Sequence, residues 1–182
     1  MNKSSDDHRT TLRARLLRWL RSVFFYALLL LLGGVVGNIW MTRNQASGTA
    51  PVIAGVSLNG QHTEIEYASF ERPLLVYFFA DWCPICKLQN SAIESIASDY
   101  PVVGVAMQSG DLNNVKAYVA AEQLALDVIN DDTGRLSQGF SVNGVPAAFI
   151  IDKHGQILSS TRGYTNQWSL RARLLMARHG WL

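Results

Sequence analysis

The stretch Trp82-Cys83-Pro84-Ile85-Cys86 decides the fold, because it places a Cys-x-x-Cys pair between an apolar run and a helical pattern. The run before it, Leu74–Ala80 (LLVYFFA), is typical of a strand buried on both faces. The apolar residues after it recur at helical spacing, with polar Gln89 and Asn90 between them: Leu88, Ala92, Ile93, Ile96 and Ala97. Cys83 is therefore expected at a helix N-terminus, where unpaired N–H groups and the helix dipole favour a thiolate. Cys86, one turn later, is expected on the same face and within bonding reach.

The chain contains no cysteines other than Cys83 and Cys86, and this restricts what the pair can do. A zinc site needs about four ligands, whereas no second Cys pair exists and the histidines (His8, His62, His154 and His179) lack ligand spacing. Covalent haem attachment requires a histidine directly after the second cysteine, where Lys87 stands. A plain structural disulfide stays open, although closing so small a loop would stabilise the fold weakly. The strand–Cys-x-x-Cys–helix context favours redox activity.

The segment Ser22–Met41 is 20 residues long and contains no charged side chain. A helix of that length spans ~30 Å, the thickness of the hydrocarbon core of a bilayer. Residues 1–21 carry six Lys or Arg against two Asp, a net charge of +4, so the positive-inside rule places this basic N-terminus in the cytoplasm. The sequence thus predicts an anchor at 22–41 with the rest of the chain outside the cytoplasm. A cleaved signal peptide is the alternative, but its apolar region would be shorter, ~7–15 residues.

The remaining chain is expected to form a polar linker at 42–51 and one globular domain at 52–182. Residues 42–182 hold 10 Lys and Arg against 12 Asp and Glu, a net charge of −2. With no basic patch, nothing indicates a nucleic-acid partner.

The domain alternates predicted strands and helices. Its first element is a hairpin, because Val52–Val56 and Thr63–Ile65 flank the turn signal Asn59-Gly60. The other expected elements, besides the strand and helix around the Cys pair, are a strand at 102–107, a helix at 111–123, a short strand at 127–129, a helical turn within 132–140, a strand hairpin at 147–151 and 157–162, and a helix at 165–178. This order predicts an α/β fold with a mixed sheet.

The segment Phe79–Lys87 (FADWCPICK), together with Gly144-Val145-Pro146, resembles the thioredoxin fold. The resemblance covers the chain from about Val52 onward and implies a mixed central sheet flanked by helices, with the hairpin as an N-terminal extension. More narrowly, the chain is similar to the membrane-anchored, envelope-facing thioredoxin-like proteins of Gram-negative bacteria, in particular the suppressor-of-copper-sensitivity group. That similarity implies a single-pass inner-membrane protein with a periplasmic catalytic domain. It also implies a transmembrane protein as electron donor, protein disulfides as substrates, a link to copper or oxidative stress, and no cofactor or bound metal.

Five residues are the candidate site. Cys83 is expected to be the exposed, attacking thiol and Cys86 the buried, resolving one. The resemblance implies that Pro146 is cis beside the cysteines and that the backbone of Val145 pairs with an extended substrate. Trp82 is expected either to shield the site or to pack in the core.

Five positions bear on proton transfer. Tyr77 stands where many thioredoxins have a buried acid, six residues before the first cysteine. Gln89 and Ala147 stand where the cytochrome-maturation branch has glutamates. These departures put haem-protein maturation in doubt and leave the proton acceptor unassigned, since Asp81 and Glu94 are expected to be solvated at the surface.

Two other functions stay open. One is reduction of apocytochrome c, which uses the same chemistry. The other is a metal-binding module in which Cys83 and Cys86 hold Cu(I), a soft ion that two thiolates suit. Against it, no methionine or histidine is adjacent to the pair, and the resemblance places Pro146 where it would block access of a metal. Peroxidase chemistry is disfavoured by the lack of a Thr-x-x-Cys motif.

Overall fold

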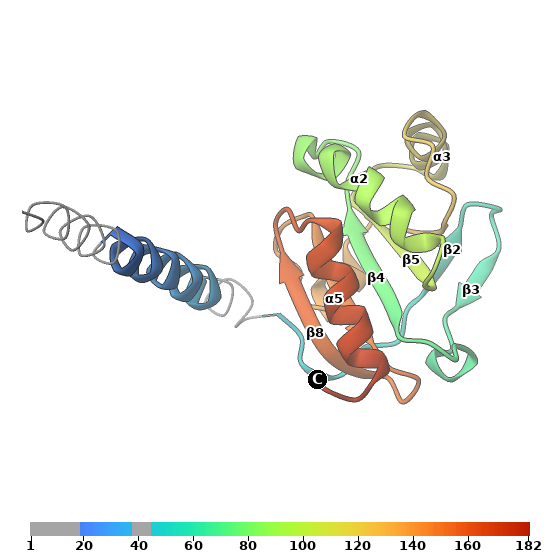
Figure 1. Cartoon of the computed structure of the whole chain (residues 1–182). Coiled ribbons are helices and arrows are strands. Elements are labelled where there is room, and N and C mark those ends of the chain that lie inside the picture. Colours follow the sequence, from blue (N-terminus) through green and yellow to red (C-terminus); the bar gives the residue numbers. More distant parts are fainter. Residues whose placement is uncertain (1–18, 38–44) are drawn as a thin grey trace, which may run out of the picture. The chain divides into compact units, whose positions relative to one another are not determined.

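The computed structural model describes residues 19–37 and 45–182, which belong to two separate compact units (Figure 1). The first unit contains the helix Trp19–Gly37, which has a mean hydropathy of 1.9 and none of its residues buried. By length and composition this helix can cross a membrane, and a signal sequence would have the same features. The described helix includes residues 22–37 of the predicted anchor, while the expected segment 38–41 and most of the basic N-terminus lie outside the described residues.

The second unit has a thioredoxin-like α/β fold, as predicted, with a mixed eight-stranded sheet within the described residues, in the order β1-β8-β7-β4-β5-β6-β2-β3. The strands are β1 (Gly48–Thr49), β2 (Ala54–Ser57), β3 (His62–Glu64), β4 (Leu74–Phe79), β5 (Val102–Met107), β6 (Asp127–Asp131), β7 (Ala147–Ile151) and β8 (Gln156–Arg162). The helices are α2 (Pro84–Ala97), α3 (Leu112–Ala121), α4 (Arg135–Gly139) and α5 (Gln167–Arg178), with a 3-10 turn at Tyr67–Ser69. Strands β4, β5 and β6 are parallel and the other neighbours antiparallel.

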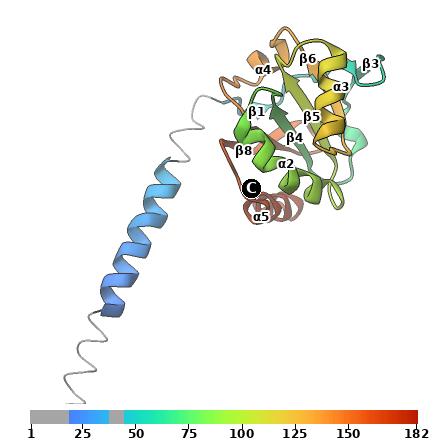
Figure 2. The same ribbon diagram turned by 90° about the horizontal axis from the view of Figure 1, so that it is seen from above.

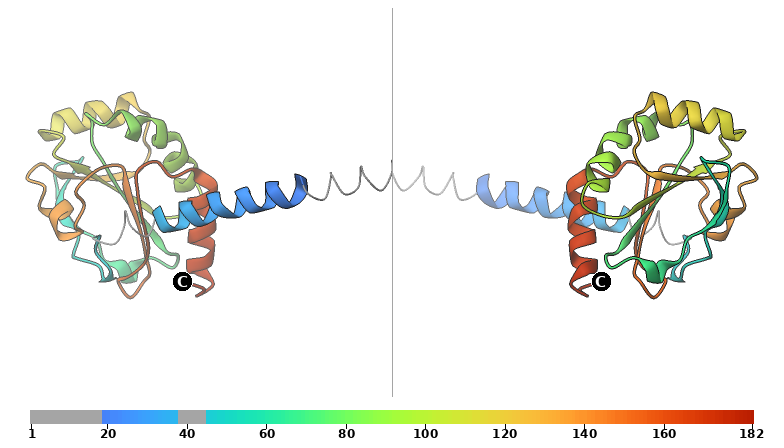
Figure 3. Two further views of the ribbon diagram at one scale, coloured as in Figure 1. Left: turned by 90° about the vertical axis from the view of Figure 1, so that its left-hand side faces the viewer. Right: turned by 90° about the vertical axis from the view of Figure 1, so that its right-hand side faces the viewer.

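Strand β4 lies in the middle of the sheet and is buried along its whole length. Because side chains alternate along a strand, Leu75, Tyr77 and Phe79 face a core shared with α2, α3 and α5. Leu74, Val76 and Phe78 face a second core that Phe140 and the segment before β2 complete. Figure 3 shows α2 (green) and α5 (red) on one side of the strands and the short α4 (orange) on the other, and Figure 2 gives the same domain from above. The sheet therefore carries α2, and the Cys pair at its start, on a rigid support.

The predicted linker at 42–51 is wrong for the residues that the structure describes, because Gln45–Ala50 is part of the domain. Gln45 is buried and donates from its Nε2 to the Thr161 carbonyl, and Ala46 N donates to Phe140 O. β1 then pairs with β8 and adds an edge strand to the sheet. This strand has only two residues, Gly48 and Thr49, and they pair through their backbones. It therefore has no alternation of apolar side chains from which the sequence could have predicted it.

The predicted N-terminal hairpin is present. β2 and β3 are antiparallel around a turn in which Ser57 N donates to Gln61 O and Gly60 has a φ of +85°. β2 also pairs with β6, so the hairpin extends the sheet at the edge opposite β1.

The orientation of helix α2 differs from the predicted one. Leu88 is 70% exposed, whereas Gln89 and Asn90 are 0% and 3% exposed. Each residue turns a helix by about 100°, so Leu88 points ~200° away from Cys86, and burying Cys86 sends Leu88 into solvent. The polar side chains that follow then face the interior and need internal hydrogen bonds.

Candidate active site

The chain turns sharply between β4 and α2, and this turn places the two cysteines. Cys83 is the N-cap of α2, with extended backbone angles, and its Sγ accepts a hydrogen bond from Cys86 N at 3.1 Å. Pro84 fills the first helical position, where its missing N–H costs nothing. Cys83 and Cys86 form a disulfide with a Cα–Cα distance of 5.3 Å. The pair is therefore present in its oxidised form.

The expected exposure of Cys83 is wrong in this oxidised state. Cys83 is 4% exposed and Cys86 0%. Bonding to Cys86 holds the Cys83 sulfur against the protein, and its other neighbour is the Val145 carbonyl, 3.6 Å from Sγ. Of the two cysteines, only Cys83 has any solvent-accessible surface.

The loop before β7 lies beside the disulfide. The Val145–Pro146 peptide bond is cis, and Pro146 O accepts a hydrogen bond from Gly163 N at 2.8 Å. Val145 thus contacts Cys83, and Pro146 contacts the segment after β8. Ala147, the position where the cytochrome-maturation branch has a glutamate, is buried at the start of β7.

Trp82 is 58% exposed and does not pack in the core. Its indole N–H donates to Gln108 O at 3.1 Å, in the loop after β5, where Gln108 has a positive φ of 46°. The core-packing alternative for Trp82 is therefore wrong, and the indole ring forms part of the surface next to Cys83.

Other exposed apolar side chains lie on the first turns of α2 and around Thr165, which is bonded to α2. Thr165 N donates to Gln89 Oε1 at 2.9 Å, which holds the β8–α5 loop against α2. On both sides of this hydrogen bond, large apolar side chains are exposed: Ile85 and Leu88 on α2, and Tyr164 and Trp168 at the start of α5. We call these four residues with Trp82 the apolar rim. Exposed groups of this kind mark interaction sites more often than scattered surface residues do.

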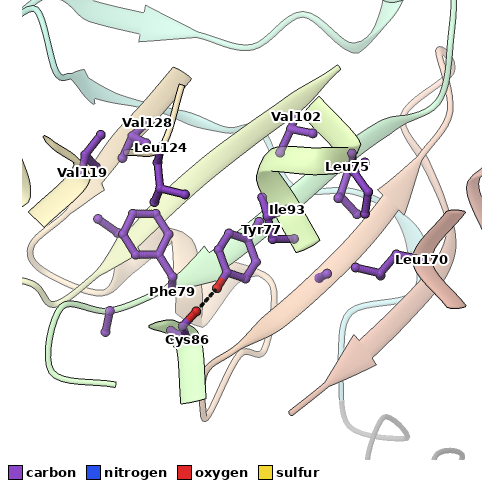
Figure 4. Close-up of a cluster of buried hydrophobic side chains, with 14 of the residues drawn as sticks. Leu75, Tyr77, Phe79, Cys86, Ile93, Val102, Val119, Leu124, Val128 and Leu170 are labelled. Carbon is purple, nitrogen blue, oxygen red and sulfur yellow. Dashed lines mark hydrogen bonds between the residues drawn. The ribbon is translucent and has the colours of Figure 1, made fainter. Parts of the chain in front are cut away.

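Tyr77 lies directly below the cysteines and is completely buried. Its hydroxyl is 3.4 Å from Cys86 O, as Figure 4 shows, and 3.3 Å from Asn90 Oδ1. Burial raises the pKa of Tyr77 far above its usual value, with smaller contributions from Tyr118 and Glu122. Tyr77 is therefore a neutral phenol at neutral pH and replaces the expected acid with an uncharged hydrogen-bonding group.

Asn90 links Tyr77 to helix α3. Its Nδ2 donates to Tyr118 OH at 3.0 Å and to Glu122 Oε2 at 3.1 Å. Burial also raises the pKa of Tyr118, which the hydrogen bond from Asn90 partly offsets. Sequence reasoning missed Asn90, Tyr118 and Glu122, because α3 carries no recognisable motif.

The remaining polar positions are more constrained than expected. Asp81 Oδ1 is buried and has no hydrogen-bond partner among the described residues, and Asp81 N donates to Ser109 Oγ. Glu94 Oε2 accepts from Ala125 N at 2.9 Å. The expectation of a solvated carboxylate is therefore wrong for Asp81, whereas Glu94 makes its bond to Ala125 N at the surface. Gln89 Nε2 likewise has no partner within the described residues.

No group of three or more His, Cys, Asp or Glu side chains in residues 19–37 and 45–182 could hold a metal ion. The chemistry that the arrangement offers is that of two adjacent thiols and the backbone around them.

Known proteins share both the sequence and the architecture. A thioredoxin-like protein of Haemophilus influenzae is 31% identical over 121 residues, which cover 66% of this chain and 72% of that protein. A Pasteurella multocida protein assigned as thiol:disulfide interchange protein DsbE-2 is 29% identical over 90 residues, covering 48% of this chain and 46% of its own length. A Chlorobium tepidum structure assigned as thiol:disulfide interchange protein DsbE superposes with a TM-score of 0.65 at 21% identity, covering 73% of this chain and 98% of that one.

The fold, the disulfide at the helix N-terminus and these relatives define a thioredoxin-like thiol:disulfide oxidoreductase. The sequence profile of the AhpC/TSA family matches residues 48–160, and the chain belongs to that family.

Proposed function

We propose that the protein is a membrane-anchored periplasmic oxidoreductase that reduces disulfides in other proteins. The observation that carries this proposal is the placement of the Cys83–Cys86 disulfide, with Cys83 capping α2 and contacting the Val145 carbonyl beside Pro146. Helix N–H groups can stabilise a thiolate at Cys83, and Cys86 is within bonding distance to resolve the product.

The reaction starts from the dithiol form. The Cys83 thiolate attacks one sulfur of the substrate disulfide, whose S–S bond breaks while a mixed disulfide with Cys83 forms, and the first substrate thiolate leaves and takes up a proton. Cys86 then loses its proton and attacks Cys83 Sγ, which releases the second substrate thiolate and forms the Cys83–Cys86 disulfide. Two electrons have passed to the substrate, and a dithiol on a donor protein must restore the reduced pair.

Protein substrates suit the surface around the disulfide. The apolar rim offers aromatic and aliphatic side chains next to Cys83, as protein interfaces commonly do. The Val145 backbone is the group that would pair with an extended substrate segment by strand addition. A small thiol compound would use neither feature.

The location rests on the helix Trp19–Gly37 and on the charge around it. Six basic residues lie within 1–21, before the uncharged segment 22–41, whereas only Arg43 closely follows that segment. The positive-inside rule supports a cytoplasmic N-terminus, an inner-membrane anchor and a periplasmic domain. A membrane-embedded protein is then the natural electron donor, because it can carry reducing equivalents across the membrane.

The narrower resemblance, to suppressor of copper sensitivity protein D, supports a role in tolerance of copper or oxidative stress. Apocytochrome c reduction is less well supported, because Gln89 is tied to Thr165 and Ala147 is buried, with no carboxylate at either position. A Cu(I)-binding module is also less well supported, because Cys83 is almost inaccessible and faces a carbonyl oxygen, a hard ligand that Cu(I) does not favour.

The test is reduction of insulin disulfides by the full chain in detergent, with dithiothreitol as the external reductant. The wild type should accelerate insulin reduction, and Cys83→Ala should reduce the rate to that of the reductant alone. Leu182→Ala is the matched control, an exposed terminal residue away from the disulfide. A wild type without exchange activity that binds Cu(I) tightly through both thiols would contradict the proposal and favour the metal-binding module.

A further inference from the structure

Four hydrogen-bonded side chains, three of them buried and the fourth partly exposed, lie next to the backbone of Cys86. Tyr77 comes from β4, Asn90 from α2, and Tyr118 and Glu122 from α3 and its C-terminal end. Asn90 is the centre, since its Oδ1 accepts from Tyr77 and its Nδ2 donates to Tyr118 and Glu122. We call these residues the Tyr77–Glu122 cluster. It joins α2 to the C-terminal end of α3, through Asn90 and Glu122, which are 32 residues apart in the sequence.

Glu122 is the one carboxylate hydrogen-bonded within this cluster, and it is well placed to keep a charge there. Its side chain is 22% exposed, so water still reaches the carboxylate. Oε2 accepts from Asn90 at 3.1 Å, and Oε1 is 3.8 Å from Lys87 Nζ. The amide of Asn90 therefore fixes the carboxylate at a set distance from Tyr77.

The charge on Glu122 affects groups that contact the turn containing Cys86. It raises the pKa of both Tyr118 and Tyr77, and the Tyr77 hydroxyl is 3.4 Å from the Cys86 carbonyl. Because the Tyr77 hydroxyl contacts the Cys86 backbone, we expect a carboxylate that disfavours ionisation of Tyr77 to disfavour a thiolate at Cys86 as well.

Other ionisable groups also face this region. Asp81, in the β4–α2 loop, contributes to the raised pKa of Tyr118, and Lys87 from α2 partly balances Glu122. Tyr77 and Tyr118 are neutral. Of the two carboxylates, only Glu122 is connected by hydrogen bonds through Asn90 to the Cys86 turn.

We propose that Glu122 is a positioning residue that sets the ionisation of Cys86, supplying from α3 the negative charge that Tyr77 does not. The assignment rests on the proposed function. The carboxylate holds Cys86 as a thiol, which slows its attack on the mixed disulfide at neutral pH and lengthens the life of that intermediate. Ionisation of both thiols would stabilise the reduced protein and make it a weaker reductant. The carboxylate disfavours that doubly ionised form and so makes the protein a stronger reductant. Helix α3 thereby controls the second half of the reaction without touching the substrate.

The aromatic disulfide dithionitrobenzoate (DTNB) separates the two half-reactions in one stopped-flow experiment on the reduced full chain in detergent. Cys83 thiolate attacks DTNB, which releases one coloured thionitrobenzoate and leaves the other bound to Cys83. Cys86 thiolate then attacks Cys83 Sγ, forms the Cys83–Cys86 disulfide and releases the second thionitrobenzoate. The rate of the second phase as a function of pH reports the ionisation of Cys86.

Glu122→Gln keeps the shape and the acceptor oxygen for Asn90 but removes the charge. Its second phase should shift to lower pH by roughly 0.5–1 unit, which below the midpoint is roughly a 3–10-fold faster release. The first phase should change less than about 2-fold, because Glu122 lies behind Cys86.

Glu94→Gln, a carboxylate on α2 that is bonded to Ala125 N, is the matched control and should leave both phases unchanged. Lys87→Gln removes the balancing cation and should shift the second phase to higher pH.

A second phase with the same pH midpoint in wild type and Glu122→Gln, at equal thermal stability, would overturn the assignment, because a purely structural role moves no pH profile. If Glu122→Gln does not fold, Lys87→Gln decides: an upward shift supports the assignment and an unchanged midpoint overturns it. A wild type that releases no thionitrobenzoate at all overturns the proposed function, and this inference with it.

Discussion

The Cys83–Cys86 disulfide separates two regions of opposite character. On its outer side lies the apolar rim of Trp82, Ile85, Leu88, Tyr164 and Trp168, which exposes large nonpolar side chains to water. On its inner side lies the Tyr77–Glu122 cluster, in which polar side chains are buried and bonded to one another. This is the reverse of the usual distribution of polar and apolar groups.

The reversal assigns a different task to each region. Covering exposed apolar side chains with another molecule lowers the free energy. The rim therefore influences which partner binds next to Cys83. Buried polar side chains fix distances and charges, so the cluster bears on when Cys86 ionises. Changes in the rim should therefore alter reactions with proteins, and changes in the cluster should alter chemistry and stability.

The largest effect in this comparison is expected at the rim. Leu88→Asp places a charge among the exposed apolar side chains of the rim and should lower kcat/KM for insulin reduction by roughly 10-fold, the effect of one interface hot spot. The rate with glutathione disulfide should stay the same, since a small substrate does not cover the rim. Val52→Asp, another exposed apolar residue, located between β1 and β2, is the control and should leave both rates unchanged. Equal losses with both substrates would show that Leu88 supports the thiol chemistry instead.

A smaller effect is expected in the cluster. The difference in unfolding free energy between the wild type and Tyr77→Phe should change sign with pH. Tyr77→Phe leaves Asn90 Oδ1 without its donor and should lower the free energy of unfolding by about 1 kcal/mol at pH 7. The pKa of Tyr77 is raised in the folded protein, so the stability due to its neutral form is complete below about pH 10, the value in the unfolded chain, and is lost as pH rises beyond it. At pH 11 the wild type should have lost about 1.4 kcal/mol more than the variant, which reverses their order.

Urea unfolding at pH 7, 10 and 11 measures this crossing. Tyr26→Phe, in the N-terminal helix outside the domain, is the control and should follow the wild type at every pH. If Tyr77→Phe stays less stable by the same amount at pH 11, the Tyr77 hydroxyl ionises as easily in the folded protein as in the unfolded one.

Much of the outer architecture could be predicted from local signals. The apolar run at β4, the Cys-x-x-Cys pair, the turn residues Asn59-Gly60 and the Val145-Pro146 dipeptide each report on a few neighbouring residues. Those signals predicted the elements and carried the resemblance to the thioredoxin fold, and it was that resemblance that implied the position of Val145 beside the cysteines.

The inner region could not be predicted, because it depends on contacts between distant elements. Periodicity identified α2 as a helix, but the packing of Cys86 set its rotation and exposed Leu88 instead of Asn90. Glu122 meets Asn90 only because the chain between β5 and β6 returns α3 to the same face of the sheet as α2. Gln45–Ala50 joins the domain through backbone pairing and one bond from the Gln45 side chain to Thr161 O, which periodic side-chain patterns do not reveal.

The most direct test of the two unequal cysteine roles is a mixed-disulfide trap in cells, read as reducible higher-mass bands on non-reducing gels. In Cys86→Ala the resolving thiol is missing, so the adduct between Cys83 and its substrates should accumulate and can be identified by mass. In Cys83→Ala the remaining thiol is fully buried, so few or no adducts should form. Equal trapping by both variants, or by neither, would contradict the assignment of Cys83 as attacking and Cys86 as resolving thiol.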